Sequence, residues 1–396
     1  LAFEGGAIGY FGYDLGRRIE KLPVIAEDVD ALPEMMIGIY DWVVIVDHDL
    51  RQAWLVAQGR APQTAAIWDE LLVRLKKPSA RKAAKALHAT DGFEASIDRA
   101  EYRRQFERIQ AYIRAGDCYQ VNYTQRFAAR VEGDAWQAYR EMRARNPVPF
   151  GAFLHLDDIE ILSFSPERFL QLERGRVTTQ PIKGTRPRGS DAREDEQLKT
   201  ALSDSLKDRA ENLMIVDLLR NDLGKACAIG SIHVPELFKV ESFARVHHLV
   251  STVRGRLAEG ENCASLLRAC FPGGSITGAP KLRAMEIIEE LEPHRRGSMG
   301  VTWATSGRRR VDVGDRDRVE LYHDRDARPR RHRGGHRRGR ARAQGRRRLL
   351  PRLQSRRPRR LGCGGPGLSR QRPRHQRCAA PEHRAPSAAA GRELEG

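Results

Sequence analysis

The chain has 396 residues and a formal net charge of +18, a value typical of nucleic-acid-binding proteins when it is spread over the whole length. The excess is confined to residues 306–396, which contain 28 Arg, no Lys and 9 acidic residues, whereas residues 1–305 carry 42 basic and 43 acidic side chains. No apolar run approaches roughly 18 residues, no signal peptide is recognisable and the 6 cysteines form no CxxC pair. These features argue against a membrane span, secretion and a zinc site, and they favour the cytoplasm.

Residues 1–75 are predicted to be rich in β structure. A hairpin is expected there, with arms at residues 35–46 and 52–57. Because the chain begins at Leu1 inside a strand-like run, we expect this part to be the remnant of a larger N-terminal β-rich subdomain. Residues 76–91 are rich in Lys and Ala and contain a proline, which is typical of a linker.

Residues 92–305 have the clearest periodic patterns and are predicted to form the main folded domain. Helices are expected at residues 99–115, 134–146, 204–223, 264–270 and 280–291. Strands are expected at residues 120–127, 152–156, 159–164, 169–172, 231–235, 238–243 and 247–255. The helix at 204–223 is expected to bury Leu206, Leu213, Met214, Ile215, Leu218 and Leu219.

The arginine-rich residues 306–396 contain too few apolar side chains to bury a core, so we expect this tail to be disordered. Two origins are compatible with its composition. A basic arm could contact nucleic acid through phosphate groups. A GC-rich gene read out of frame would also yield mainly Arg, Gly, Ala and Pro, and the absence of lysine favours this second interpretation. Nucleic acid is therefore not the expected partner.

The segment Gln180-Pro181-Ile182-Lys183-Gly184-Thr185-Arg186 is the most informative part of the chain. It follows strand-like residues and breaks at a glycine, so Lys183 is expected at a strand end beside a tight turn. A lysine amine withdrawn from water at such a place can act as a nucleophile. Taken alone, the pattern also fits a solvated surface lysine.

Other segments accompany the lysine loop in a fixed order. They are residues 116–122, 165–167, 181–185, 208–222 and 273–281, the last reading Gly273-Gly274-Ser275-Ile276-Thr277-Gly278-Ala279-Pro280-Lys281. Together they resemble the chorismate-utilising enzymes, and the resemblance covers roughly residues 1–300. It implies a fold of the α/β (α+β) class in which two packed antiparallel sheets are surrounded by helices. It also implies that residues 92–305 are an incomplete catalytic domain.

The resemblance implies a role for each of several side chains. Lys183 would be the nucleophile, Glu167 the general acid that protonates the departing hydroxyl, and His248 a group near the reacting ring. Glu211 would hold Mg²⁺, with an ion pair to Arg209 or Arg220 as the alternative. Substrate contacts are expected from Gln120, Gly184, Thr185 and Thr277.

Gln120 and Lys183 indicate a branch of this family. Members that add water carry a lysine base where this chain has Gln120, and Lys183 stands where anthranilate-forming members usually have alanine. The resemblance therefore implies transfer of an amino group to chorismate, giving 4-amino-4-deoxychorismate for folate and para-aminobenzoate synthesis. Ammonia would come from a glutamine amidotransferase subunit. The alternative is the anthranilate-forming branch.

The chain departs from the family pattern after Gly297. The family continues with a segment whose arginine grips a substrate carboxylate, and then with a helix that carries a second magnesium-binding glutamate. Neither is recognisable here. We therefore expect the C-terminal part of the fold to be missing and the chain as written to be inactive.

Overall fold

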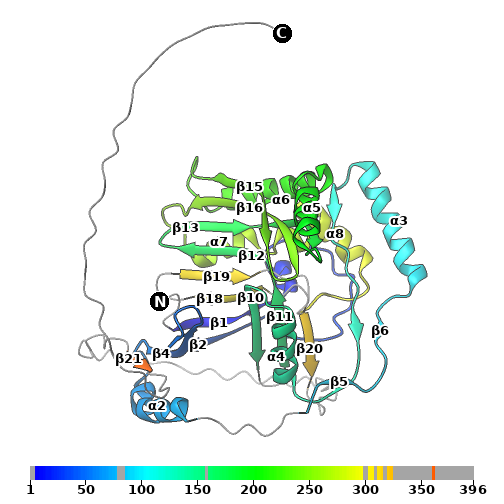
Figure 1. The fold of residues 1–396 in the computed structure, drawn as a ribbon. Helices are drawn as coiled ribbons and strands as arrows, with labels where there is room; N and C mark the ends of the chain where they lie inside the picture. Colours follow the sequence, from blue (N-terminus) through cyan, green and yellow to red (C-terminus); the bar gives the residue numbers. More distant parts are fainter. Residues whose placement is uncertain are drawn as a thin grey trace, which may run out of the picture. The chain divides into compact units, whose positions relative to one another are not determined.

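The computed structural model describes residues 5–77, 85–156, 159–297, 302–306, 310–314, 319–323 and 359–361, and it describes side chains only up to residue 297. Most of these residues form antiparallel sheets with helices around them (Figure 1). Within this described part, no helix is both long enough and apolar enough to cross a bilayer.

The larger sheet has nine strands, and every neighbouring pair is antiparallel. Its strands, in spatial order, are β14 (Ile182–Pro187), β16 (Val246–Arg256), β13 (Arg176–Gln180), β12 (Arg168–Glu173), β19 (Arg310–Gly314), β18 (Thr302–Ser306), β1 (Gly6–Phe11) and β2 (Met35–Tyr40). The remaining strand, β15 (His233–Ser242), pairs with β16. Segments far apart in sequence therefore lie side by side, as Figure 1 shows.

A smaller antiparallel sheet contains β10 (Phe150–His155), β11 (Ile159–Ser165) and β20 (Val319–His323). It packs against the larger sheet where Tyr10 of β1 meets Ile159 and Ile161 of β11 in one buried cluster. The arrangement confirms the expected fold class of two packed antiparallel sheets with outer helices. On its other side, Tyr139 of α4 (Ala135–Arg145) packs against Leu162.

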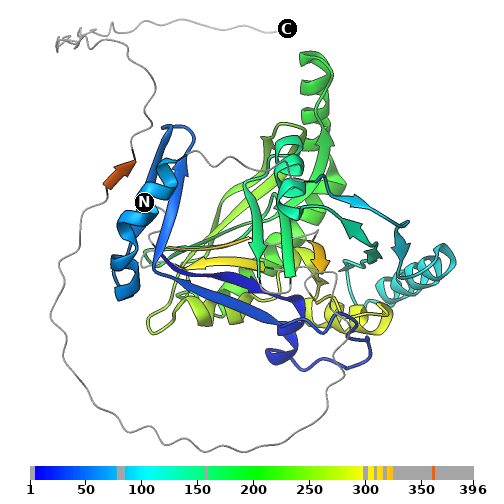
Figure 2. The ribbon, with the colours of Figure 1, turned by 90° about the horizontal axis from the view of Figure 1, so that it is seen from below.

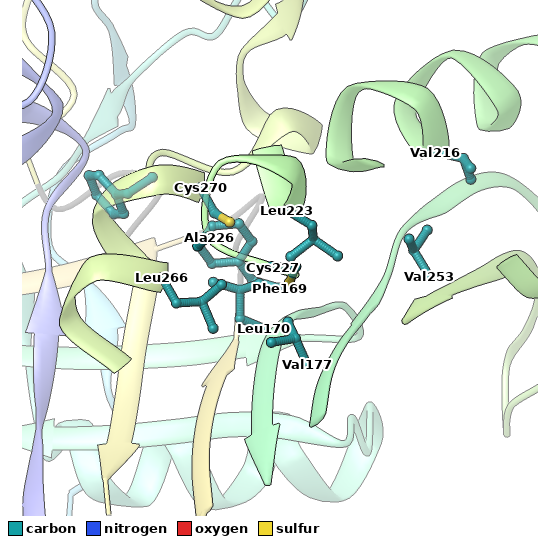
Figure 3. Packing of buried hydrophobic residues seen from close by; sticks show 11 residues of the cluster. Phe169, Leu170, Val177, Val216, Leu223, Ala226, Cys227, Val253, Leu266 and Cys270 are labelled. Carbon is teal, nitrogen blue, oxygen red and sulfur yellow. The ribbon is translucent and has the colours of Figure 1, made fainter. Parts of the chain in front are cut away.

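The main hydrophobic core lies between the larger sheet and two helices, α6 (Leu206–Gly224) and α7 (Cys263–Cys270). Its labelled side chains in Figure 3 are Phe169, Leu170, Val177, Val216, Leu223, Ala226, Cys227, Val253, Leu266 and Cys270. Burying side chains of this size stabilises a fold by about 1.5–3 kcal/mol each. The core thus fixes α6 and α7 over the strands that carry the lysine loop.

The remaining helices lie around this core. They are α3 (Arg99–Ala115), α5 (Ala192–Ser203) and α8 (Lys281–Leu291). Ile109 of α3 packs with Ile287 and Leu291 of α8, and the two helices are neighbours in Figure 2. The smaller elements are η1 (Tyr13–Arg18), β3 (Trp42–Asp47), β4 (Gln52–Ala57), α1 (Pro62–Ala66), α2 (Trp68–Lys76), β5 (His88–Ala89), β6 (Glu94–Ala95), β7 (Gln120–Val121), β8 (Phe127–Ala128), β9 (Val131–Glu132), η2 (Gly274–Ile276), β17 (Gly278–Ala279) and β21 (Arg359–Leu361).

The N-terminal part differs from the expected hairpin. The predicted first arm is broken at Asp41, so that β2 pairs with β1 in the larger sheet while β3 pairs with β4. Residues 62–76 form two helices that the sequence interpretation left out. The division of the chain into a remnant, a linker and a catalytic domain stays a prediction.

Two expectations about the C-terminal half need correction. Leu206 is 81% exposed and Leu213 is 51% exposed, so the buried face of α6 was predicted only in part, with Ile215 and Leu219 buried as expected. That face consists of Asp208, Asn212, Ile215, Val216, Leu219, Asp222 and Leu223. The tail was also expected to be disordered from residue 306 onward, but residues 310–314 and 319–323 pair into the two sheets. The origin of the tail stays a prediction, and most of it lies outside the described residues.

Candidate active site

Lys183 lies in an irregular part of β14. The register between β14 and β16 shifts between Ile182 and Thr185, so Lys183 and Gly184 form a bulge at this point. Gly184 has φ +95°, and a Cβ there would come within 2.9 Å of the Cβ of Asp208. Only glycine fits this backbone without strain, so the loop takes a shape that another residue would not readily adopt. In that shape the half-buried Lys183 donates from Nζ to the carbonyl oxygen of Ser275 at 3.3 Å.

Glu167 lies in the turn between β11 and β12 and is only 8% exposed. A buried carboxylate needs hydrogen-bond donors, and two of them reach its Oε1. The backbone N–H of Ile182 donates at 3.3 Å, and the hydroxyl of Ser275 donates to the same oxygen. Ser275 therefore joins the two groups that the sequence singled out, since its carbonyl holds Lys183 and its hydroxyl holds Glu167.

Asn122 completes this arrangement from the other side. Its amide Nδ2 donates to the Ser275 carbonyl at 2.7 Å, and its backbone N–H donates to the carbonyl of Thr277 at 2.9 Å. Neither Ser275 nor Asn122 was identified as a site residue from sequence. The available signal was their position inside two of the ordered motifs, next to Thr277 and Gln120.

Thr277, which the sequence assigns to substrate binding, makes hydrogen bonds within the glycine-rich turn. It is fully buried, and its hydroxyl lies 3.1 Å from the carbonyl oxygen of Gly273 and 3.2 Å from that of Gly274. Its backbone N–H also donates to Gly274. Both hydrogens are thus donated inside the glycine-rich turn. The residue therefore stabilises the turn that presents Ser275, and its contact with substrate stays a prediction.

Thr185 and His248 face each other across β14 and β16. The Thr185 hydroxyl lies 2.9 Å from Nδ1 of His248, and the ring of Phe243 contacts the imidazole edge-on at 5.4 Å. Burial lowers the pKa of His248 below its usual 6.5. The imidazole is therefore neutral at pH 7. Thr185 lies two residues from Lys183 on β14, and His248 lies opposite Thr185 on β16, so three predicted residues occupy one strand pair.

Gln120 lies on β7, which pairs with β17 immediately after the glycine-rich turn. Its side chain lines a pocket of about 450 Å³, whose walls also include Tyr102, Phe106, Asn122, Tyr123 and Arg296. Within the described part of the chain, Gln120 Oε1 and the Tyr123 hydroxyl have no hydrogen-bond partner. Gln120 therefore lines the same pocket as Asn122.

The sequence predicts Glu211 on the buried side of α6, and this prediction is wrong. Its side chain is 38% exposed, and its Oε1 lies 3.9 Å from Nζ of Lys207, which replaces the expected arginine partners. The neighbouring Asn212 takes the buried position. Its Nδ2 donates to the Leu249 carbonyl at 3.0 Å, and its Oδ1 accepts from the Ser251 hydroxyl at 2.5 Å. This amide fastens α6 to β16.

The fit of Mg²⁺ can be judged from these side chains. Among the described residues, no group of three or more His, Cys, Asp or Glu side chains could hold a metal ion. Glu211 alone contributes one carboxylate, whereas Mg²⁺ commonly uses one or two together with ligand oxygens and water. The described residues therefore do not build a metal site by themselves.

Comparison with known proteins gives a consistent result. The chain matches the family of chorismate binding enzymes over residues 2–302. It is 53% identical over 304 residues to aminodeoxychorismate synthase component 1 of Klebsiella aerogenes, covering 76% of this chain and 66% of that protein. It is 42% identical over 301 residues to anthranilate synthase component 1 of Thermus thermophilus, covering 75% of this chain and 65% of that protein. The chain thus spans just under two thirds of the length of these curated relatives.

Solved structures show the same relationship. Anthranilate synthase component I from Streptococcus pneumoniae superposes with a TM-score of 0.73 at 32% identity, covering 81% of this chain and 73% of that one. The menaquinone-specific isochorismate synthase MenF of Escherichia coli superposes with a TM-score of 0.60 at 14% identity, covering 81% of each chain. At 14% identity, this second likeness supports the fold alone.

Proposed function

The chain belongs to the chorismate binding enzyme family, and on this premise we propose that it transfers an amino group to C4 of chorismate, giving 4-amino-4-deoxychorismate. The observation that carries the proposal is the meeting of Lys183 and Glu167 on Ser275. A nucleophilic amine and a buried carboxyl group held by one residue suit a displacement in which one group attacks and the other protonates the leaving group.

In the proposed reaction, the Lys183 amine attacks C2 of chorismate and the ring double bond shifts. The C4–O bond breaks, and Glu167 in its acid form donates a proton so that the hydroxyl leaves as water. Ammonia then adds at C4, the double bond shifts back, and the C2–N bond to Lys183 breaks. Chorismate and ammonia thus become 4-amino-4-deoxychorismate and water, and the lysine is regenerated. The bond to the enzyme divides one difficult displacement into two easier steps.

One side chain supports addition of ammonia over addition of water. Gln120 is an amide and cannot remove a proton from water as a lysine base would. We propose that a glutamine amidotransferase subunit supplies the ammonia in the cell. Folate synthesis would be the pathway that uses the product.

We also propose Mg²⁺ as a cofactor, on the basis of the single carboxylate of Glu211. Glu211 is the carboxylate that would contribute to its binding, and the ion would neutralise a substrate carboxylate. Because the described residues do not form a complete metal site, the reaction above is written without the ion. The expectation of low turnover by this chain also stays a prediction, so the test uses enzyme and chorismate in stoichiometric amounts.

The test has two arms, both read by mass spectrometry. With ammonium and Mg²⁺ present, the product should be 4-amino-4-deoxychorismate. With ammonium omitted, the peptide that contains Lys183 should gain the mass of chorismate less one water. Lys183→Ala should abolish both signals, while Lys199→Ala should retain them, because Lys199 is a surface residue paired with Glu196 on α5.

Three results would contradict the proposal. Formation of 2-aminobenzoate would assign the chain to the anthranilate-forming branch. Formation of isochorismate would show that water is the nucleophile. A covalent adduct on a lysine other than Lys183 would show that the nucleophile has been assigned to the wrong residue.

A further inference from the structure

Arg296 is a buried cation beside the site that the proposed reaction does not use. Its side chain is 3% exposed, and its guanidinium lies 4.5 Å above the ring of Tyr13. Its Nε and Nη2 donate to the carboxylate of Glu292 at 2.9 and 2.6 Å. Burial on its own would lower the pKa of Arg296, but the charge of Glu292 offsets this and the pKa is raised. The pair is therefore charged and held in one geometry.

The two nitrogens at the end of this guanidinium also donate to backbone carbonyls from distant segments. Nη1 donates to Ile276 O at 2.6 Å, and Nη2 donates to Asn122 O at 2.5 Å. Glu292 extends the same connection, since its Oε1 accepts from the backbone N–H of Thr124 at 2.9 Å and from the Thr124 hydroxyl at 3.1 Å. The pair thus ties the chain around residues 122–124 to the glycine-rich turn.

Both tied segments meet at the Ser275 carbonyl. Ile276 directly follows Ser275, so a bond to its carbonyl fixes the orientation of the next peptide. Asn122 donates to the Ser275 carbonyl at 2.7 Å, and Lys183 donates to the same oxygen at 3.3 Å. A guanidinium has its donors in one rigid plane, so it can set the spacing of two carbonyls more closely than an ammonium can.

We propose that Arg296, paired with Glu292, is a positioning residue that fixes the Ser275 carbonyl and through it the amine of Lys183. Its guanidinium donates to Glu292, Ile276 and Asn122, so it acts on the site through these groups. The effect of the amine's position on the reaction rests on the proposed function. The contacts of Arg296 and Glu292 are independent of that function. Misplacement of a reacting group by about 1 Å can cost a hundredfold in rate.

A second buried arginine, Arg17 of η1, provides a matched control. Arg17 forms a similar ion pair with Glu289 of α8, and their side chains are 13% and 5% exposed. Arg17 also donates to Asp14 and to the Pro23 carbonyl, none of which belongs to the site. Arg296→Lys and Arg17→Lys each keep a buried charge and remove the planar donor fork. A purely structural role for Arg296 would make the two variants behave alike.

The first measurement does not depend on chorismate. The full chain is acetylated with limiting acetic anhydride, and the ratio of labelling at Lys183 to labelling at Lys199 is read in the same molecules by mass spectrometry. In Arg296→Lys the ratio should rise about fivefold, the factor that corresponds to losing a hydrogen bond of about 1 kcal/mol. Arg17→Lys should leave the ratio unchanged.

The second measurement is the rate of the Lys183 adduct with chorismate. Arg296→Lys should lower the rate at saturating chorismate about tenfold or more, with a much smaller change in the half-saturating concentration, because the residue acts through the position of the amine. If the wild type forms no adduct but the labelling ratio responds as expected, the proposed function fails and the positioning role stands.

An unchanged labelling ratio in folded Arg296→Lys would overturn the inference, and so would an equal rise in both variants. Thermal unfolding reports whether each variant is folded. If Arg296→Lys does not fold, Thr124→Val replaces it, because this change removes only the hydroxyl bond to Glu292. A smaller rise in the ratio is then expected, and no rise would again overturn the inference.

Discussion

Replacing Gly184 by alanine is predicted to destabilise the protein more than the same change at Gly175. Both glycines have a left-handed backbone, with φ of +95° and +77°. A Cβ at Gly175 would have nothing within 4 Å, whereas at Gly184 it would lie 2.9 Å from Asp208 Cβ and 3.0 Å from Leu202 Cδ1. The two variants therefore share the backbone strain and differ in the contact with α5 and α6.

The magnitudes follow from these two contributions. Placing alanine in a left-handed conformation costs about 1–2 kcal/mol, which is all that is expected at Gly175. Overpacking against fixed neighbours adds about 1–3 kcal/mol at Gly184. The free energy of unfolding should thus fall by about 2–5 kcal/mol in Gly184→Ala. Because the bulge also carries Lys183, the acetylation of that lysine should change in Gly184→Ala alone.

Urea unfolding followed by circular dichroism gives both free energies, and equal m-values would show that the same surface is exposed in each variant. An equal loss of stability in the two variants would refute the reasoning. It would mean that Leu202 and Asp208 yield to the new methyl group, so that the lysine loop is not held by the helices behind it.

Three further predictions concern the residues around the site. Asn212→Ala should lower the free energy of unfolding by about 2–4 kcal/mol, because the Leu249 carbonyl and the Ser251 hydroxyl lose their buried partner. A loss below about 0.5 kcal/mol, measured by urea unfolding, would contradict this prediction. The folded-state pKa of His248 lies below its unfolded value of 6.5, so its contribution to stability is complete above pH 6.5 and is lost as the pH falls. The Tm of His248→Gln should therefore depend less on pH than the Tm of the wild type. An unchanged slope of Tm against pH between pH 7 and 5 would contradict the lowered pKa of His248. Glu211→Gln should raise the Mg²⁺ concentration needed for adduct formation about tenfold or more, as measured by titrating the metal into chelator-treated protein, and an unchanged titration would remove Glu211 from the metal site.

Elements with strong local signals were predictable from sequence. The helix at residues 99–115 has the predicted bounds, since Asp98 caps its start and Gly116, with φ +82°, ends it. The prediction of the first hairpin arm was wrong for a different reason. Alternating apolar residues indicate a strand but not its partner, so the break at Asp41, where β2 and β3 enter different sheets, left no clear local mark.

The site was only partly predictable for a related reason. Lys183 and Glu167 stand out because their side chains carry chemistry, and the structure brings both to Ser275. Ser275 and Asn122 act through a carbonyl, a hydroxyl and an amide that join segments 153 residues apart, which no spacing in the sequence reveals. The orientation of α6 was misjudged because apolar residues occur on every side of the helix and the buried face includes the polar Asn212.

The order of strands in the larger sheet has a consequence for synthesis on the ribosome. β1 is made first, yet its neighbours are β2 and β18, and β12 is completed only by β19. Until residues 302–314 emerge, β1 and β12 each present an unpaired edge, and such edges bind other chains readily. Contacts between residues as far apart in sequence as Ala7 and Ser306 also form slowly. A change of sequence in the last strands therefore acts on the first ones, and chains stalled before them should depend on chaperones to escape aggregation.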